Sequence, residues 1–331
     1  MSIFSDADGQ PTSTTATTNV TPQSQQQREQ CNIELRSLLP SEMGYYWDTR
    51  APNQAAQLEY ADKFFQPTKY FPSLLWMTGT FLTTPRSSAQ PEVAFLGRSN
   101  VGKSSLLNAI MGKEDMCYTS KKPGRTRTMN AFGIAQKGVS PQIVLLDMPG
   151  YGAGSRAEWG TEIIKYLLGR RQLRRTFVLI DSMHGLKDSD LKILALLRSY
   201  GVSHQVVLSK VDRILLSNSS NNRKKKKKKP ATTSESKIAA LRDMLHELKP
   251  IIQPTDRFQG PGALGEIITC SAETPVEPGK PLGISALRWA ILTAAGFDGS
   301  AELPREAALS AVLRRKPKDQ AESYSEKAEH S

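Results

Sequence analysis

The chain has 331 residues, a formal net charge of +12, and 38% hydrophobic and 7% aromatic residues. This length allows one large domain or two small ones with a sizeable core, and the low aromatic content predicts that some segments lie outside that core. The 3 cysteines form no Cys-x-x-Cys pair, which argues against a disulfide framework and a thiolate metal site and favours a reducing compartment.

The positive charge is concentrated in a small part of the chain. Residues 1–90 carry six Lys or Arg against eight Asp or Glu, whereas the run Arg223–Lys229 alone carries seven positive charges. A surface of this kind suits nucleic acid or another polyanion, and it equally suits a solvated protein surface. Charge therefore leaves both interpretations open.

No part of the sequence has the length and composition of a membrane span. The longest apolar run, Tyr70–Leu82, is shorter than the roughly 18–20 residues required and is interrupted by a proline and a glycine. We therefore expect no membrane partner.

The beginning of the chain is rich in Ser, Thr and Gln and lacks the apolar core of a signal peptide. Some transit peptides have this composition, but Asp6 and Asp8 and the absence of arginine before Arg28 make the match weak. We predict that residues 1–33 are disordered and that residues 34–90 form a partly helical lead-in, with a short helix within 53–65.

From residue 91 to residue 297, short apolar runs alternate with longer helical patterns. This alternation predicts an α/β domain with an open, mostly parallel sheet covered by helices on both faces, whose ligands bind at the carboxyl ends of the strands. The predicted strands are 92–97, 129–135, 142–147, 176–182, 203–209 and 266–271. The predicted helices are Lys103–Met111, Arg156–Leu173, Lys187–Tyr200, Ser236–Leu248 and Gly283–Ala295.

The first predicted strand leads into Gly-Arg-Ser-Asn-Val-Gly-Lys-Ser (97–104) and then into a helix. This pattern is typical of a phosphate-binding loop, in which backbone N–H groups and the positive end of the helix surround nucleotide phosphates. Lys103 is expected to reach the β- and γ-phosphates, and Ser104 to bind Mg²⁺. A chance glycine-rich turn is the alternative, which the strand–loop–helix context disfavours. The residues expected at the phosphates are Gly97, Asn100, Val101, Gly102, Lys103, Ser104 and Ser105.

A polar stretch, Thr-Ser-Lys-Lys-Pro-Gly-Arg-Thr-Arg-Thr-Met-Asn (119–130), leads into the second predicted strand. Its position is typical of a switch loop, in which a threonine binds Mg²⁺ only when a γ-phosphate is present. Thr126 or Thr128 can serve, and the residues alone leave this choice open.

The third predicted strand ends at Asp147 and is followed by Met-Pro-Gly-Tyr-Gly. An acid at this place can hold Mg²⁺ from across the phosphate loop, and the N–H of Gly150 can sense the γ-phosphate. A strand-ending aspartate that caps a turn is the alternative reading. Many GTPases carry a water-orienting glutamine directly after this glycine, where this chain has Tyr151. The sequence therefore names no catalytic residue.

Two motifs at later strand ends predict guanine as the base. Asp212 can accept hydrogen bonds from guanine N1–H and its amino group while the Lys210 stem covers the purine, whereas adenine would leave this carboxylate facing an acceptor. After the last strand, the backbone N–H groups of Ser271 and Ala272 are expected to meet guanine O6. Each motif alone is weak evidence for guanine. Together, in this order at successive strand ends, they make guanine the predicted base.

Together, these motifs closely resemble the EngB/YihA family of TrmE-Era-like GTPases. The resemblance covers residues 71–297 and is carried by the phosphate loop, the switch Pro-Gly-Arg-Thr, Asp-x-Pro-Gly-Tyr-Gly, Leu-Ser-Lys-Val-Asp and Cys-Ser-Ala-Glu. It implies one Ras-like P-loop GTPase domain, an EngB-type G domain over 91–297, with a mixed, mostly parallel six-stranded sheet. It further implies GTP binding, slow hydrolysis and a role in late assembly of the large ribosomal subunit. Organellar members of this family act on mitochondrial or plastid ribosomes.

The resemblance also assigns individual residues. Thr126 becomes the switch threonine, and Asn100 matches a position that helps to bind K⁺ in several relatives; a loop-stabilising amide is the equal alternative. The switch and base residues that it implies are Gly124, Arg125, Thr126, Gly150, Ser209, Lys210, Asp212, Ser271 and Ala272. The metal ligands that it implies are Ser104, Thr126 and Asp147.

The chain departs from the family pattern in three places. Ser209 stands where the family usually has threonine, Ala153 stands where an aromatic residue is common, and a basic run follows Asp212. We predict that 217–236 is a disordered basic insertion, which either grips rRNA phosphates or is a neutral loop expansion. Residues 298–331 are predicted to form a charged, mostly disordered tail.

These observations predict a monomeric GTP-binding switch protein that uses GTP/GDP and Mg²⁺, with K⁺ as a further candidate. Its expected partner is the large ribosomal subunit or its rRNA, and its expected location is mitochondrial, with the cytoplasm as the alternative. Two other functions stay open: a tRNA-modification-type GTPase, and a GTP-dependent binding module whose hydrolysis is incidental.

Overall fold

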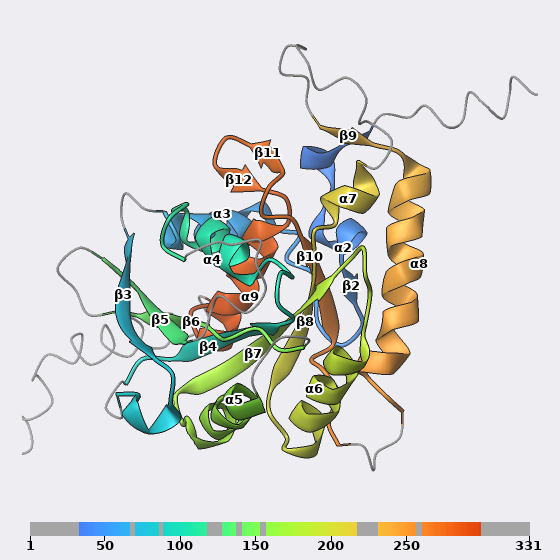
Figure 1. Cartoon of the computed structure of the whole chain (residues 1–331). Helices are drawn as coiled ribbons and strands as arrows, with labels where there is room; N and C mark the ends of the chain where they lie inside the picture. Colours follow the sequence, from blue (N-terminus) through green and yellow to red (C-terminus); the bar gives the residue numbers. More distant parts are fainter. Residues whose placement is uncertain are drawn as a thin grey trace, which may run out of the picture.

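The computed structural model describes residues 33–66, 70–85, 89–117, 128–136, 141–152, 157–216, 231–255 and 260–298. Over these residues a large twisted sheet runs through the middle of the molecule, and helices cover both of its faces (Figure 1). The Ras-like α/β architecture predicted from the sequence is confirmed.

The six predicted strands all form. They are β4 (Glu92–Gly97), β5 (Met129–Gln136), β6 (Ile143–Asp147), β7 (Leu173–Asp181), β8 (His204–Ser209) and β10 (Glu266–Cys270). Strands β10, β8, β7, β4 and β6 run parallel, and β5 is antiparallel to β6. Every residue of β4, β6, β8 and β10 is buried, because helices cover both faces, and these strands therefore read as continuous apolar runs.

Two further strands extend the sheet at its edges. Strand β2 (Tyr45–Tyr46) is antiparallel to β10, and β3 (Tyr70–Thr78) is antiparallel to β5. The sheet therefore has 8 strands, in the order β2-β10-β8-β7-β4-β6-β5-β3, where six were expected. Both added strands come from the lead-in, which was predicted only as partly helical; its helix forms as α3 (Ala55–Phe64).

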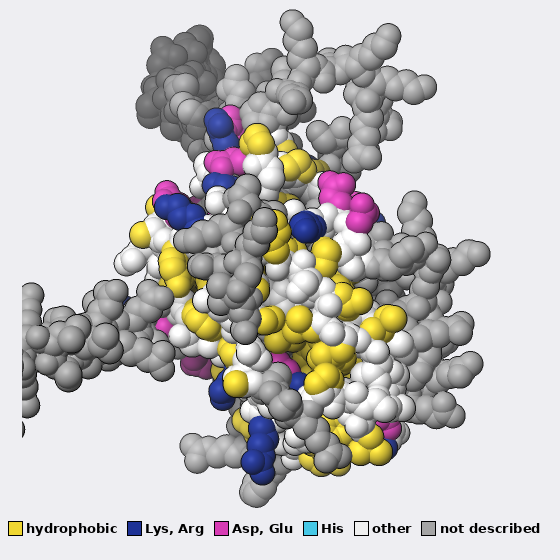
Figure 2. All heavy atoms as spheres, turned by 90° about the vertical axis from the view of Figure 1, so that its left-hand side faces the viewer, with side chains coloured by type: hydrophobic (Ala, Val, Ile, Leu, Met, Phe, Trp, Pro, Cys, Tyr) yellow, Lys and Arg dark blue, Asp and Glu magenta, His cyan; other side chains and the backbone are white. Residues whose placement is uncertain are grey.

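Strand β3 contains most of the apolar run 70–82 and has a strand neighbour on one side only. Several of its large apolar side chains are exposed, with Met77 at 61% and Leu74 at 52%. Figure 2 looks at this side of the molecule and shows hydrophobic side chains gathered there. Within the described ranges, no helix combines the length and the apolar character needed to cross a bilayer.

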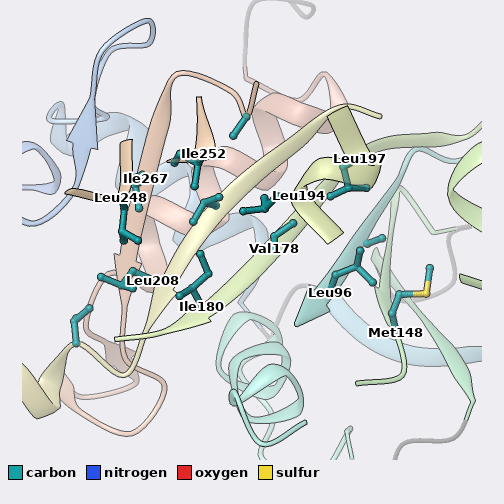
Figure 3. Packing of buried hydrophobic residues seen from close by; sticks show 14 of the residues in the cluster. Leu96, Met148, Val178, Ile180, Leu194, Leu197, Leu208, Leu248, Ile252 and Ile267 are labelled. Carbon is teal, nitrogen blue, oxygen red and sulfur yellow. The ribbon is translucent and has the colours of Figure 1, made fainter. Parts of the chain in front are cut away.

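The helices bury one apolar stripe each against the sheet. Helices α5 (Ala157–Gly169), α6 (Asp188–Ser199) and α8 (Glu235–Ile252) cover one face, and α3, α4 (Lys103–Met111) and α9 (Ile284–Ala295) cover the other. Figure 3 shows the first of these two clusters, where Leu194 and Leu197 of α6 pack near Val178 of β7. The predicted helices are confirmed within a few residues, although α8 continues through Pro250 to Ile252.

Shorter elements complete the described chain: β1 (Ile33–Glu34), the 3₁₀ turns η2 (Leu35–Ser37) and η3 (Phe81–Thr83), α2 (Pro40–Met43), α7 (Asp212–Leu215), β9 (Thr232–Thr233), β11 (Pro275–Glu277) and β12 (Lys280–Pro281). Strand β1 pairs with β9, so the predicted insertion 217–236 overlaps ordered structure at its carboxyl end. Thr233 is buried there and its hydroxyl donates to the Leu215 carbonyl at 2.8 Å. The run Arg223–Lys229 and residues 299–331 lie outside the described residues.

Candidate nucleotide-binding site

The motif residues gather where parallel strands end at one edge of the sheet. The strand register places Asp181 at the end of β7 beside Ser209 at the end of β8, and Ser209 beside Cys270 at the end of β10. On the other side of β7, Phe95 of β4 lies beside Asp147 at the end of β6. This edge is where open α/β sheets bind their ligands.

The turn between β4 and α4 has the backbone that a phosphate loop requires. Asn100 and Gly102 have φ angles of 64° and 102°, in the left-handed region, and α4 begins at Lys103 directly after them. A Cβ atom on Gly97 would lie 2.8 Å from Val101 Cγ1, so the loop packs tightly only with glycine there. The amino end of α4 faces into this turn, where its unpaired N–H groups can bind phosphate.

The Lys103 side chain lies inside the loop. Its Nζ donates to the carbonyl of Gly97 at 3.1 Å and to that of Arg98 at 3.4 Å, and the residue is 7% exposed. Burial lowers the pKa of the Lys103 ammonium, and the nearby Asp147 carboxylate opposes this shift. A buried ammonium held only by neutral carbonyls and one carboxylate has a strong affinity for an incoming phosphate.

Ser104 and Asp147 lie together at the mouth of the loop. The Ser104 hydroxyl donates to Asp147 Oδ2 at 3.1 Å, and Asp147 is 1% exposed. Burial raises the pKa of the Asp147 carboxyl, and Lys103 and the Ser104 hydroxyl lower it. Asp147 Oδ1 has no hydrogen-bond partner among the described residues, although it is buried. A hydroxyl beside a buried carboxylate with one unpaired oxygen fits a Mg²⁺ ion.

The turn after Asp147 packs directly on the phosphate loop. A Cβ atom on Gly150 would lie 2.8 Å from Ser99 Oγ and 3.0 Å from Ser99 N, so only glycine allows this approach. The Tyr151 hydroxyl donates to Asp190 Oδ1 at 2.9 Å, on the first turn of α6. Burial raises the pKa of the Tyr151 hydroxyl, and the neighbouring Asp190 carboxylate adds to this rise, so the hydroxyl remains a donor. Tyr151 is therefore engaged with α6.

The base motif is tied to the phosphate loop through Ser209. Its hydroxyl lies 3.0 Å from the carbonyl oxygen of Val101 and 3.1 Å from that of Ile180. One hydroxyl has one proton, so the two carbonyls share this donor. Burial raises the pKa of the neighbouring Cys270 thiol to about 12, and the Asp212 carboxylate adds to this rise. The N–H of Val211 donates to the Cys270 carbonyl at 3.3 Å, so the segment that carries Asp212 lies beside the end of β10 and the second base motif.

Lys210 is fixed by three contacts. Its Nζ donates to Asp181 Oδ2 at 2.7 Å and to the Asn100 carbonyl at 2.8 Å, and its own carbonyl accepts from the Ser182 hydroxyl at 2.9 Å. Its φ of 61° is unusual for a residue with a side chain, and such strain persists at sites where neighbours impose it. Asp181 and Ser182 were missed from the sequence; the signal was available, since Asp181 ends an apolar strand just as Asp147 does.

The second base motif requires one correction. The Ser271 N–H donates to the carbonyl of Leu282 at 2.9 Å, so its single proton is already used and the expected bond to guanine O6 has no donor there. The hydroxyl of Ser271 instead accepts the N–H of Glu273 at 3.3 Å. Of the two expected donors, Ala272 N–H is the one that remains a candidate.

Three expected residues, Gly124, Arg125 and Thr126, lie outside the described residues, as does the departure at Ala153. Thr128, the other switch candidate, is described, and its hydroxyl donates to Asn130 Oδ1 at 2.8 Å. Ser105 lies half-buried in the first turn of α4. The structure thus brings together the phosphate, metal and base residues from 97 to 105, at 147 and 150, from 209 to 212, and at 271 and 272.

Comparisons with known proteins find similar sequences. Residues 92–210 match a protein-family model described as a 50S ribosome-binding GTPase. The "Probable GTP-binding protein EngB" of Bartonella tribocorum (strain CIP 105476 / IBS 506) is 38% identical over 211 residues, which cover 61% of this chain and 83% of the relative. The protein with the same name from Brucella melitensis biotype 1 is 46% identical over 132 residues, covering 37% of this chain and 55% of the relative.

Solved structures are similar over part of the chain. One described as "Crystal structure of a probable GTP-binding protein engB" aligns with a TM-score of 0.36 and 19% identity, over 62% of this chain and 98% of that chain. Another, "Crystal structure of Era in complex with MgGDPNP and nucleotides 1506-1542 of 16S ribosomal RNA", aligns with a TM-score of 0.41 and 24% identity, over 62% of this chain and 56% of that chain.

Proposed function

This chain belongs to the EngB family of GTP-binding proteins, and we propose that it is a slow GTPase that acts as a switch in assembly of the large ribosomal subunit. The observation that carries the nucleotide part is the cluster of Lys103, Ser104 and Asp147 at the amino end of α4. A buried ammonium, a hydroxyl and a carboxylate with a free oxygen are the groups that a Mg²⁺–nucleotide complex requires.

Ser104 and Asp147 would hold Mg²⁺ on the protein side, with Thr126 as a further ligand in the GTP state. When bound, Mg²⁺ would neutralise charge on the β- and γ-phosphate oxygens. The Lys103 ammonium would neutralise the same phosphates from the floor of the loop, and the N–H of Gly150 would report whether a γ-phosphate is present.

Slow turnover is supported by Tyr151. Its hydroxyl is hydrogen-bonded to Asp190, so the residue that occupies the usual glutamine position is directed toward α6. In some GTPases an arginine supplies positive charge that stabilises the transition state. We propose that K⁺, bound with the help of Asn100, supplies part of this positive charge here. The same observation also supports a second function, a binding module in which GTP occupancy alone controls the partner and hydrolysis is incidental.

The proposed partner is the large ribosomal subunit or its rRNA, which the description of the matching family model supports. We propose further that the protein acts as a monomer and that it works in mitochondria, with the cytoplasm as the alternative. The basic run Arg223–Lys229 would add salt-dependent attraction to rRNA phosphates.

Sedimentation of the tagged protein with ribosomal particles tests this proposal. We expect co-migration with a large subunit in the presence of a non-hydrolysable GTP analogue and loss of co-migration with GDP. The rRNA in that fraction then identifies the compartment. Equal sedimentation with both nucleotides would contradict the switch, and co-migration with tRNA alone would favour the tRNA-modification alternative.

The nucleotide site is tested separately by Lys103→Ala. Removing the ammonium deletes at least one charge-assisted contact to phosphate, and GTP affinity should fall at least about 100-fold. The matched control is Lys63→Ala, because the Lys63 side chain is 69% exposed on α3. Unchanged GTP affinity in Lys103→Ala, measured by calorimetry, would remove the site assignment.

A further inference from the structure

Asp190 is a buried carboxylate that joins three segments of the chain. It lies on the first turn of α6 and its side chain is 0% exposed. Its Oδ1 accepts the Tyr151 hydroxyl at 2.9 Å, and its Oδ2 lies 2.9 Å from Arg98 Nε and 2.9 Å from the backbone N of Lys187. The contact with Arg98 is an ion pair, whereas the Tyr151 hydroxyl and the Lys187 N–H donate hydrogen bonds, and removing the carboxylate would leave the buried Tyr151 hydroxyl without its acceptor.

Two of these partners belong to the nucleotide site. Arg98 is the second residue of the phosphate loop, and Tyr151 directly follows Gly150. The backbone connects them as well, because Ser99 N donates to the Tyr151 carbonyl at 3.2 Å and Tyr151 N to the Gly97 carbonyl at 3.4 Å. The phosphate loop and the turn that carries the Gly150 N–H are therefore held against each other, and Asp190 anchors both side chains from behind.

The contact of Asp190 with Lys187 stabilises the start of α6 and does not reach the nucleotide site. The Lys187 N–H donates to the Asp190 carboxylate at the start of α6, which is the carboxylate half of a capping box and a structural contact at the end of the helix itself. Arg98 also donates to the Gly185 carbonyl at 3.0 Å, so it remains attached to this region without the carboxylate. The bond from Tyr151 is the contact that reaches the γ-phosphate side of the site.

We propose that Asp190 is a positioning residue that, through Tyr151 and Arg98, holds the Gly150 N–H where it distinguishes GTP from GDP. The inference rests on the proposed GTPase function and deepens it. GDP needs the phosphate loop and the base motif, and it has no γ-phosphate for the Gly150 N–H to contact. GTP also needs the Gly150 turn, so loss of the anchor should weaken GTP selectively.

The first test variant is Tyr151→Phe. It keeps the ring and the Lys187–Asp190 cap and removes only the hydroxyl that reaches Asp190. We expect about tenfold weaker binding of a non-hydrolysable GTP analogue, GDP affinity within about twofold of the wild type, and a matching decrease in kcat/KM for GTP hydrolysis. The matched control is Tyr200→Phe. Tyr200 is 57% exposed and lies at the carboxyl end of α6, the helix that carries Asp190, so this variant should change neither affinity.

The second variant, Asp190→Asn, keeps the volume and removes the charge, and it should weaken the GTP analogue more than Tyr151→Phe does. Equal losses for GTP analogue and GDP in Tyr151→Phe would show a merely structural role and overturn the proposal, as would unchanged affinity for both. If the wild-type protein bound neither nucleotide, the proposed function itself would fail, and that result is visible before any variant is compared.

Discussion

Ser209 makes the contacts that tie the base motif to the phosphate loop, although the family usually has threonine at this position. Its hydroxyl reaches the carbonyl oxygens of Val101, in the phosphate loop, and of Ile180, near the end of β7. The hydroxyl is the group that both side chains share, so the departure from the family pattern preserves the interaction. The methyl group that threonine would add is not required for it.

Two replacements of Ser209 should therefore distinguish the contribution of its hydroxyl from that of the rest of the side chain. Ser209→Ala leaves the Val101 carbonyl without this donor. We expect the free energy of guanine-nucleotide binding to become less favourable by about 1 kcal/mol, which corresponds to about fivefold weaker binding. Ser209→Thr keeps the hydroxyl and should bind within about twofold of the wild type. Fluorescence titration with a labelled GDP measures both. If alanine and threonine behaved alike, the hydroxyl would have no role in joining the two loops.

Asn100 can be tested at the same scale because its backbone angle narrows the choice of variant. Its φ of 64° suits asparagine or glycine, so Asn100→Gly removes the amide without straining the loop. If the amide helps to bind K⁺, wild-type hydrolysis should be at least about tenfold faster in K⁺ than in Na⁺. The increase should stay below the roughly 10³- to 10⁵-fold increase in kcat that a catalytic arginine provides in other GTPases. Asn100→Gly should lose this difference. Equal wild-type rates in both salts would remove the potassium proposal.

At the scale of elements, the lead-in supports the helix that carries the phosphate loop. Arg288 of α9 is buried and donates to the carbonyls of Ile110 and Ala109, which end α4, at 3.0 Å each. Asp62 of α3 accepts from Arg288 at 2.9 Å and from the Ser285 hydroxyl at 2.9 Å. Cations at a helix carboxyl end are favourable, and this one is held in place by a residue from the lead-in.

Asp62→Ala should consequently destabilise the whole domain. The change leaves the Arg288 guanidinium buried without its carboxylate, and breaking a buried pair in this way costs about 3–5 kcal/mol. Glu59→Ala on the same helix removes an exposed pair with Lys63 and should change the free energy of unfolding by less than about 1 kcal/mol. Urea denaturation compares the two variants. Similar values for both would show that Arg288 does not depend on Asp62.

Most of the helices and strands could be predicted from the sequence. Six strands and their covering helices follow from buried apolar runs and helical periods, and the phosphate loop follows from its consensus. Strand β3 lies in the apolar run 70–82, which was weighed only as a membrane span, so its signal was present and was missed. Strand β2 could not be found, because it has two residues and its pairing with β10 joins segments more than 200 residues apart. The Arg98–Asp190 and Asp62–Arg288 pairs were missed for the same reason: no local pattern indicates which distant charges share a buried position.

For the whole molecule, acid stability depends on a buried histidine. His204 begins β8, is 1% exposed, and its Nδ1 lies 2.8 Å from the Val202 carbonyl. Its Nε2 is buried without a hydrogen-bond partner among the described residues. Burial lowers the pKa of His204, the bond to Val202 opposes this, and the charge of Arg198 adds to the lowering.

A lowered pKa in the folded state means that the unfolded chain binds the proton first. Stability from His204 is therefore complete above the ordinary histidine pKa of about 6.5 and falls as the pH drops below it, until the folded histidine is protonated as well. If His204 stays neutral in the folded protein, about 2 kcal/mol is lost between pH 7.5 and pH 5. The net charge of +12 adds its own repulsion in acid, so the wild type alone cannot isolate this effect.

The comparison that isolates it is His204→Gln, which replaces the ring by a polar side chain that does not titrate. Its free energy of unfolding in urea should change by about 2 kcal/mol less than that of the wild type between pH 7.5 and pH 5, because its unfolded chain gains no proton at this position. His246→Gln, on the exposed face of α8, controls for the loss of a histidine and should follow the wild type. Parallel pH profiles for His204→Gln and the wild type would show that the pKa of His204 is the same in the folded and unfolded chain, which contradicts the lowering.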